Sequence, residues 1–565
     1  MKHLFSLIFT ISLLLSLSGC SSDGSGRSDS PTDTNDTNDT NDTNFTFPDA
    51  VVHDEMFTTL HFSGAGNCAD CHDGIETDNG LDVSLVKAWK GVMMANAAID
   101  PFYRAKVASE VKRNPAYKEV IEEKCSRCHM PMASVAAHYN GETPAISGDG
   151  FTNPDNPHYD EAMHGVSCTL CHRIEETPEM GTTAGFSGGF EVNTTAMGAE
   201  RKIYGPYDNL KANPMINNVQ FTPEYSAHMD DSKHCASCHN LNTPVIAANG
   251  VLTNPVRFFP EQAVYTEWEY SDFNTTKNCQ ECHMPTAEGG VVISTKGNGG
   301  PRAPFHQHKF IGANTYMLEI IKNNRMKLGA LADEARFEQS ITDTREFLKA
   351  AADVNISGVA FADNTLRFSV KVTNHSGHKF PTSLPSRRAW LHVKVTNAAD
   401  QTVFESGAFN DKGQIIGVDD STGYEKHHKT IDRDSSVQVY EPIMADTAGN
   451  QTYTFMHAAA YLKDNRILPS GYKSSTPANA QPYGDAITDG DFAGGSDTVA
   501  YRVEGLADGY YSISVTLLYQ TASYGFMRDL YKDDALIEVA LIKALDSNTT
   551  LHFETVSSDS ASYNP

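Results

Sequence analysis

The sequence predicts a multi-domain α+β protein, with a mostly helical or irregular N-terminal domain followed by a β-sandwich-like C-terminal domain. Five Cys-x-x-Cys-His motifs crowd into residues 68–283, which leaves too little chain for an ordinary apolar core. Apolar residues at helical spacing then run through residues 331–354. Beyond them, apolar and polar residues alternate with the period of two that is typical of strands.

Each Cys-x-x-Cys-His motif predicts a covalent c-type haem site. Two thiols one helical turn apart can add to the two vinyl groups of one haem, and the next residue can place its imidazole on the iron. A zinc site, a redox pair or a local disulfide would not require that histidine five times. The predicted attachment residues are Cys68, Cys71, Cys125, Cys128, Cys168, Cys171, Cys235, Cys238, Cys279 and Cys282, and the predicted proximal iron ligands are His72, His129, His172, His239 and His283. The five porphyrins themselves should form the core of a haem-packed domain at 49–314.

The one remaining cysteine, Cys20, follows a short basic start and the apolar run Leu4 to Leu17, which indicates a secretory signal at 1–19. Leu17-Ser18-Gly19-Cys20 resembles the lipobox of bacterial lipoproteins, in which the cysteine is lipidated. An ordinary signal peptide with an incidental cysteine is the alternative. Residues 20–48 then predict a lipidated cysteine and a disordered tether rich in Thr, Asn and Asp. The protein is therefore expected to be an outer-membrane lipoprotein on the periplasmic or cell-surface face.

The formal net charge of -27 argues against nucleic acid or an anionic membrane surface as a partner, because like charges repel. The expected partners are other redox proteins, namely cytochromes, a quinol oxidase or an outer-membrane conduit, or an extracellular acceptor. Contact with the membrane is expected through the N-terminal lipid.

Further elements follow from the local patterns. Helices are expected at Leu81–Met94 and Tyr117–Cys128, and loops that cover haem edges at 181–189 and 289–304. Linking helices are expected at 315–354. The β-sandwich-like domain is predicted at 355–556, with strands around Leu366–Val372, Trp390–Val395, Val437–Tyr440, Thr498–Val503, Tyr511–Leu517 and Leu536–Ile542.

Several phrases resemble the multihaem cytochromes related to cytochrome c554. They are Ala88–Ala97 (AWKGVMMANA), Asp100–Tyr103 (DPFY), Cys128–Pro131 (CHMP), Val166–His172 (VSCTLCH) and Cys282–Pro285 (CHMP). The resemblance covers residues 60–310. It implies electron transfer through haems that carry two histidine ligands each, although distant relatives act on hydroxylamine, nitrite or tetrathionate.

The sixth ligand of each iron separates an electron carrier from an enzyme, since an empty position lets a substrate bind. Histidines outnumber the five positions to be filled, and methionines such as Met130 and Met284 are expected to pack rather than ligate. The candidate distal ligands are His61, His138, His164, His228, His234, His306, His308, His378 and His375.

The last two candidates lie in the segment Asn374–Thr382, in the β-rich part of the chain, with Arg387 and Arg388 close behind. Two interpretations stay open. Either His378 or His375 reaches back to a haem while the arginines pair with propionates, or the segment is a β-turn with a solvated arginine pair. His427, His428 and His457 are expected to be ordinary surface residues.

The leading hypothesis is a pentahaem cytochrome that transfers electrons in extracellular or periplasmic respiration, with no catalytic residue. The alternative is a terminal oxidoreductase in which one open haem reduces a small nitrogen or sulfur oxyanion. Pentahaem nitrite reductases typically hold their catalytic haem by Cys-x-x-Cys-Lys, which this sequence lacks. A structural subunit of a cytochrome filament is a third hypothesis. The chain is thus more an electron-transfer protein than an enzyme.

Overall fold

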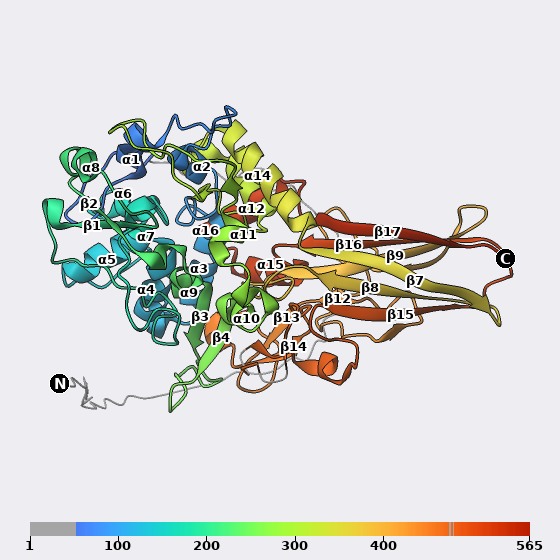
Figure 1. The fold of residues 1–565 in the computed structure, drawn as a ribbon. Coiled ribbons are helices and arrows are strands. Elements are labelled where there is room, and N and C mark those ends of the chain that lie inside the picture. Colours follow the sequence, from blue (N-terminus) through green and yellow to red (C-terminus); the bar gives the residue numbers. More distant parts are fainter. Residues whose placement is uncertain (1–51, 474–475, 478–479) are drawn as a thin grey trace, which may run out of the picture. The chain divides into compact units, whose positions relative to one another are not determined.

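The five motifs lie on short helices that loops connect, and the long strands follow them (Figure 1). The computed structural model describes residues 52–473, 476–477 and 480–565, which fall in one compact unit. The predicted signal peptide, Cys20 and the tether up to residue 48 lie outside the described residues. Within the described part, no helix has the length and apolar character needed to cross a membrane.

Most of the first 300 described residues are short helices and loops. Their three small sheets pair β1 with β2, β3 with β4 and β5 with β6. The helices are α1 (Ala65–His72), α2 (Leu85–Lys90), α3 (Pro101–Arg113), α4 (Lys118–His129), α5 (Pro131–Tyr139), α6 (Tyr159–Met163), α7 (Cys168–Cys171), α8 (Ala212–Val219), α9 (Ser232–His239), α10 (Val264–Glu269), α11 (Cys279–His283), α12 (Thr315–Asn323), α13 (Arg325–Leu328) and α14 (Glu334–Lys349). The strands are β1 (Lys202–Gly205), β2 (Thr222–Tyr225), β3 (Asn240–Pro244), β4 (Phe258–Ala263), β5 (Thr286–Ala287) and β6 (Phe305–His306).

Local chemistry explains where these helices begin. The side chain of Asp100 accepts hydrogen bonds from the backbone N–H groups of Phe102 and Tyr103, and Pro101 occupies the first turn of α3, where it needs no donor. The expected helix at 117–128 is confirmed by α4. Of the helix expected at 81–94, only α2 forms, and the loops expected at 181–189 and 289–304 are present.

Helix α14 confirms the amphipathic pattern that precedes the strands. The side chain of Asp333 accepts a hydrogen bond from the backbone N–H of Arg336 and caps the helix. Phe337, Ile341 and Leu348 are buried on one face. Phe337 and Ile341 pack into a core that also contains side chains of α3, α4 and α5, so α14 covers the haem-motif region.

The Phe337→Ala variant is expected to lower the free energy of unfolding by about 3–5 kcal/mol, because Phe337 is fully buried and the truncation leaves a cavity. Denaturant unfolding of the intact protein measures the change. Phe258 is 60 % exposed on β4, so Phe258→Ala should stay within about 0.5 kcal/mol of the wild type. Equal losses in both variants would contradict the packing of α14.

The C-terminal part is a β-sandwich, and the predicted α+β class is confirmed. One sheet has the order β11-β15-β8-β7, and the other has the order β10-β9-β16-β17, with β12 also paired to β9. A separate pair joins β13 and β14. The strands are β7 (Ala352–Ala362), β8 (Thr365–Asn374), β9 (Arg388–Asn397), β10 (Thr402–Ser406), β11 (Thr430–Ile431), β12 (Val439–Tyr440), β13 (Pro442–Ala445), β14 (Ala460–Asp464), β15 (Ser496–Glu504), β16 (Tyr511–Gln520) and β17 (Glu554–Tyr563).

Alternate side chains of the two sheets meet in one apolar core. Val370 and Val372 of β8 and Ile513 and Val515 of β16 all belong to it, so the inner faces of both sheets pack against each other. The edges β7 and β17 also lie side by side, and the backbone N–H of Ile356 donates to the carboxylate of Asp559. These contacts close one side of the sandwich.

The strand predicted at Leu536–Ile542 is wrong. This segment forms helix α16 (Ile537–Ser547), which follows the shorter α15 (Tyr524–Leu530). Val539, Ile542 and Leu545 are buried at helical spacing and share a core with residues of α3, which α16 contacts. The short apolar run fits either structure, and packing against the haem-motif region selects the helix. The chain returns to the sandwich as β17.

Candidate haem centre

The side chains of all five motifs line one continuous cavity of about 1230 Å³. This is larger than the pocket of a typical single ligand, roughly 300–1,000 Å³. The described part of the chain contains ten motif cysteines, and none of the ten forms a disulfide. A cavity that collects five sets of two thiols and one imidazole fits several covalently bound haems. We number these predicted haems I to V in chain order.

Each motif occupies a helix or its end. The two cysteines lie three residues apart on α1, α4, α7, α9 and α11, so both thiols project from the same face. The histidine ends the helix or follows it directly. At the fifth motif, Asn278 and Glu281 form a reciprocal capping box that starts α11 one residue before Cys279.

The proximal histidines are held in the orientation that an iron ligand needs. Nδ1 lies 2.7 Å from the backbone carbonyl oxygen of Ile293 in His72, and 2.6 Å from that of Tyr204 in His172. His283 contacts the carbonyl of Ile311 in the same way. When Nδ1 donates to a carbonyl, the ring is fixed and Nε2 is free to bind metal.

Burial also keeps these imidazoles neutral. It lowers the pKa of His129 and of His239 to about 4, which leaves the metal-binding form at neutral pH. The proximal histidines therefore fit a buried haem iron in geometry and in charge.

His308 faces His172 across the cavity. The two rings are within 11° of parallel, and their centroids are 6.2 Å apart. Two imidazoles that bind one metal from opposite sides have centroids about 6 Å apart, because each metal–nitrogen bond is about 2 Å and each half-ring adds about 1 Å. His308 Nδ1 also contacts the carbonyl of His306. This geometry favours His308 as the distal ligand of haem III.

His378 forms the same arrangement with His283. The ring centroids lie 6.3 Å apart and the planes differ by 23°. His378 Nδ1 is 3.0 Å from the carbonyl oxygen of Lys379, which leaves Nε2 available. Burial lowers the pKa of His378 to about 4. The contacts therefore favour the first interpretation of the 374–382 segment, in which the β-rich part supplies a distal ligand, here to haem V.

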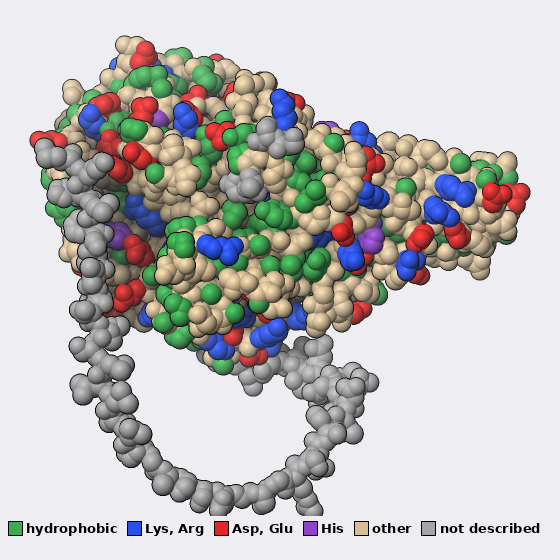
Figure 2. All heavy atoms as spheres, turned by 90° about the horizontal axis from the view of Figure 1, so that it is seen from below, with side chains coloured by type: hydrophobic (Ala, Val, Ile, Leu, Met, Phe, Trp, Pro, Cys, Tyr) green, Lys and Arg blue, Asp and Glu red, His purple; other side chains and the backbone are tan. Residues whose placement is uncertain are grey.

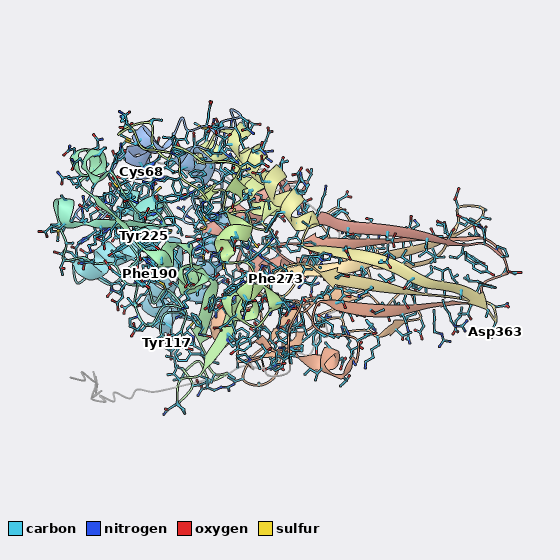
Figure 3. All side chains as sticks on the ribbon, in the orientation of Figure 1. Cys68, Tyr117, Phe190, Tyr225, Phe273 and Asp363 are labelled. Atoms are coloured by element: carbon cyan, nitrogen blue, oxygen red, sulfur yellow. The ribbon has the colours of Figure 1, made fainter. Side chains whose placement is uncertain are left out.

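The loop that carries His378 is pressed against the haem-motif region. A Cβ atom added to Gly377 would lie 3.1 Å from Trp268 and 3.2 Å from Phe273, so a side chain fits poorly there. Figure 3 labels Phe273 near the junction of helices and strands, and Cys68 on the far side of the helical part. The loop of His378 therefore meets the helical part close to the strands, at Trp268 and Phe273.

Two further candidates have nitrogens without a partner among the described residues. His61 is buried with both ring nitrogens unsatisfied, and His234 is half-buried with its buried Nδ1 atom unsatisfied. His234 also lines the cavity. Buried polar atoms are normally hydrogen-bonded, so an unsatisfied imidazole fits a site that awaits a metal or a hydrogen-bonding group.

The contacts of the remaining candidates do not favour iron ligation. His164 contacts Ala65 N–H through Nε2 and His53 through Nδ1, and both nitrogens of His228 are hydrogen-bonded. His138 and His375 are half exposed and face carboxylates, Glu123 and Asp353. His306 lines the cavity, but Nδ1 contacts the carbonyl of Met284 and Nε2 faces Asp230.

Arg387 and Arg388 have different surroundings. Arg387 lines the cavity, and among the described residues its guanidinium donates a hydrogen bond only to the carbonyl of Thr382, so its charge is free to meet a propionate. The same prediction for Arg388 is wrong. Arg388 is buried and forms two hydrogen bonds with Asp419 at 2.7 and 2.8 Å.

Thiols of different motifs touch. Cys68 contacts Cys168, Cys128 contacts Cys238, and Cys235 contacts Cys279. Cys171 is also close enough to Cys235 and Cys238 to interact electrostatically with them. Haems attached at these thiols would therefore be neighbours in the pairs I–III, II–IV, III–IV and IV–V.

Two features of the site were not predicted from the sequence. Tyr103 stacks on His129 with parallel rings and centroids 3.8 Å apart, and its buried hydroxyl has no partner among the described residues. The phrase Asp100–Tyr103, noted only for its resemblance, was the available signal. Glu267 on α10 is fully buried and contacts the loop of His378. Nothing in the local pattern around Glu267 indicates this role.

His427 is buried, contrary to expectation, and lies with Asp489 and Asp497 in a cluster of metal-ligand type. However, its Nδ1 accepts hydrogen bonds from the side-chain amides of Gln438 and Asn465. The ring proton is therefore on Nε2, which donates to Asp489. A metal-binding histidine has the opposite arrangement, so the cluster is a hydrogen-bonded part of the sandwich.

Comparison with known proteins gives a family match over part of the chain and a similar solved structure. Residues 67–173, which include the first three motifs, match the family described as cytochrome c554 and c-prime. A penta-heme cytochrome c552 from Thermochromatium tepidum is a similar solved structure, at 14% sequence identity and a TM-score of 0.48, with 89% of this chain and 99% of that chain covered. The comparison with curated proteins found no match.

Proposed function

We propose that the chain is a pentahaem c-type cytochrome that passes electrons through closely spaced, mainly bis-histidine haems in respiration. The observation that carries the proposal is the two pairs of opposed imidazoles, His172 with His308 and His283 with His378, in a cavity that all five motifs line. Two histidine ligands leave no coordination position for a substrate. Closed irons suit electron transfer rather than catalysis.

The thiol contacts support a continuous path. Bound haems would supply the one-electron chemistry, and the chain would hold them near one another at the Cys68–Cys168, Cys128–Cys238 and Cys235–Cys279 contacts and where Cys171 approaches Cys235 and Cys238. The resulting order runs from haem I through III and IV to V, with II joined at IV. The protein's own part is to fix ligand orientation and to exclude water from the cavity.

The proposed setting follows from the sequence. A lipid on Cys20 and the tether to residue 48 would hold this body at the outer membrane, on the periplasmic or cell-surface face. The partners would be other redox proteins or an extracellular acceptor. On the face shown in Figure 2, acidic and basic side chains are interspersed rather than gathered in one block. Such a surface suits brief contacts with partners better than a tight complex held by charge alone.

A second function has one observation in its favour. Among the described residues, no imidazole opposes His129 as His308 opposes His172, and Tyr103 lies against the ring instead. The cavity beside Cys125 is lined by Lys106, Glu110 and Glu261. An open haem II here would reduce a small nitrogen or sulfur oxyanion, for which Lys124 offers positive charge, whereas Lys106 is paired with Glu110 at 2.7 Å.

Electron paramagnetic resonance of the oxidised protein, with iron counted and cyanide added, tests both functions. We expect five irons per chain and low-spin signals of haems III and V that cyanide leaves unchanged. If all five signals resist cyanide, the electron carrier is supported. A high-spin iron that responds to cyanide supports the second function, and cyanide binding at haems III and V would refute the ligand pairs.

A further inference from the structure

Hydrogen bonds on both sides of His378 fix the segment that carries it. It leaves β8 at Asn374, whose side-chain amide donates to the carbonyl oxygens of His378 at 2.8 Å and Ile467 at 3.0 Å. Phe380 then pairs with Ile467 through two backbone hydrogen bonds. The chain around His378 is therefore tied to Ile467, which follows β14.

Glu267 ties the same segment to the haem-motif region. It lies on α10, which packs against α9, the helix of the fourth motif. One carboxylate oxygen accepts hydrogen bonds from the backbone N–H of Lys379 at 3.1 Å and from the hydroxyl of Thr382 at 2.6 Å. Glu267 thus holds the residue next to His378, and it is close enough to interact electrostatically with the imidazole itself.

Three further charges complete a buried cluster. Arg466 lies 3.1 Å from the other oxygen of Glu267 and contacts Asp464 at 2.8 Å. The ammonium group of Lys379 contacts Asp464 at 2.6 Å. All four side chains are at most 6 % exposed, so water screens their charges little. We call Glu267, Lys379, Asp464 and Arg466 the Glu267 cluster.

We propose that the Glu267 cluster positions His378 on the iron of haem V and sets the midpoint potential of that haem through the charge of Glu267. The proposal rests on the proposed function, because it requires His378 to be a distal ligand. With two cations and two anions the cluster is neutral as a whole. Its anionic member nearest the imidazole stabilises the more positive, oxidised iron and so keeps the potential low.

A purely structural cluster would only hold the sandwich against the helices. The two roles differ in their effect on haem V, because a structural contact changes stability alone, whereas a positioning contact also changes the potential and the accessibility of the iron.

The Glu267→Gln variant separates these roles. The amide keeps the shape and an acceptor for Lys379 and Thr382 but removes the negative charge, which leaves the cluster with an excess positive charge. We expect the reduced-to-oxidised ratio of haem V, at a given applied potential, to rise about tenfold, a shift of about 59 mV for one electron. Spectroelectrochemical titration with the low-spin signal of haem V as the readout measures it.

A matched control is the buried pair of Arg388 and Asp419 in the same β-rich part, which has no contact with the loop of His378 among the described residues. Asp419→Asn should lower thermal stability and leave the potential of haem V unchanged. If Glu267→Gln and Asp419→Asn give the same potential as the wild type, the cluster is structural and the proposal is overturned.

Two more variants test the positioning role and its premise. Thr382→Val removes one hydrogen bond to Glu267 without a change of charge, and we expect cyanide to replace His378 at haem V in this variant, although it leaves haem V of the wild type unchanged. A haem V signal that still resists cyanide in Thr382→Val would count against the positioning role even if Glu267→Gln failed to fold. His378→Ala tests the premise: if it leaves every haem signal unchanged, the ligand assignment fails, whereas an effect of His378→Ala without one of Glu267→Gln refutes only the cluster's role.

Discussion

The His308→Ala variant is expected to convert haem III alone from a closed, low-spin site to one with an open coordination position. His308 is half-buried and lies opposite His172, and the two nearly parallel rings have the separation expected of two ligands on one metal. Loss of one imidazole raises the midpoint potential, here by on the order of 0.1 V, a part of the roughly 0.8 V range that axial ligands span. Electron paramagnetic resonance with cyanide and a redox titration would show one changed signal and four unchanged ones.

His306→Ala is the matched control, because His306 lines the same cavity but directs Nδ1 to the carbonyl of Met284 and faces Asp230 with Nε2. Its signals should match those of the wild type. A change in His306→Ala with none in His308→Ala would reverse the assignment. Haem III stands between haems I and IV in the proposed order, so its shifted potential should also slow transfer from haem I to haem V.

The local parts of the haem centre could be predicted from the sequence, whereas the ring pairs could not. Spacing within five residues defines each motif, and helices α4 and α14 follow from their own periodicity. His308 and His378 meet their partners only after long stretches of chain have folded around the cavity. The surplus of histidines therefore gave a candidate list but no assignment, and His164 and His228 prove to be hydrogen-bonded within the core.

The mistaken strand at 536–542 has the same cause. Its apolar residues are consistent with a strand or a buried helix, and the choice depends on what lies opposite. In the structure α3 lies opposite, and Val539 and Ile542 pack into the core it shares with α16. Arg113 at the end of α3 also pairs with Asp529 and Asp533 at 2.7 and 2.8 Å.

These contacts explain how a β-rich part can serve a haem centre. One segment, α15 to α16, leaves the sandwich and packs on α3, while the loop of His378 reaches toward the fifth motif from the end of β8. Two separate attachments resist rotation of the sandwich relative to the helices. A distal ligand from that part then keeps a fixed distance from the iron, which a single flexible connection would not ensure.

The Asp464→Asn variant is expected to lower the free energy of unfolding by about 3–5 kcal/mol, because it leaves the buried cations Lys379 and Arg466 with one carboxylate between them. Burial alone would raise the pKa of Asp464, but the charges of Arg466 and Lys379 outweigh it and hold that pKa below its ordinary value. The ion pairs of Asp464 with Lys379 and Arg466 therefore stabilise the fold at neutral pH. The wild type loses this contribution as the pH falls toward the pKa of Asp464 in the folded state. Denaturant unfolding at several pH values should show that the difference in free energy of unfolding between variant and wild type shrinks in acid.

Asp353 is half exposed beside His375, so Asp353→Asn should change stability by no more than about 0.5 kcal/mol. A loss at Asp464 as small as that at Asp353 would mean that the cluster contributes no net stability to the fold.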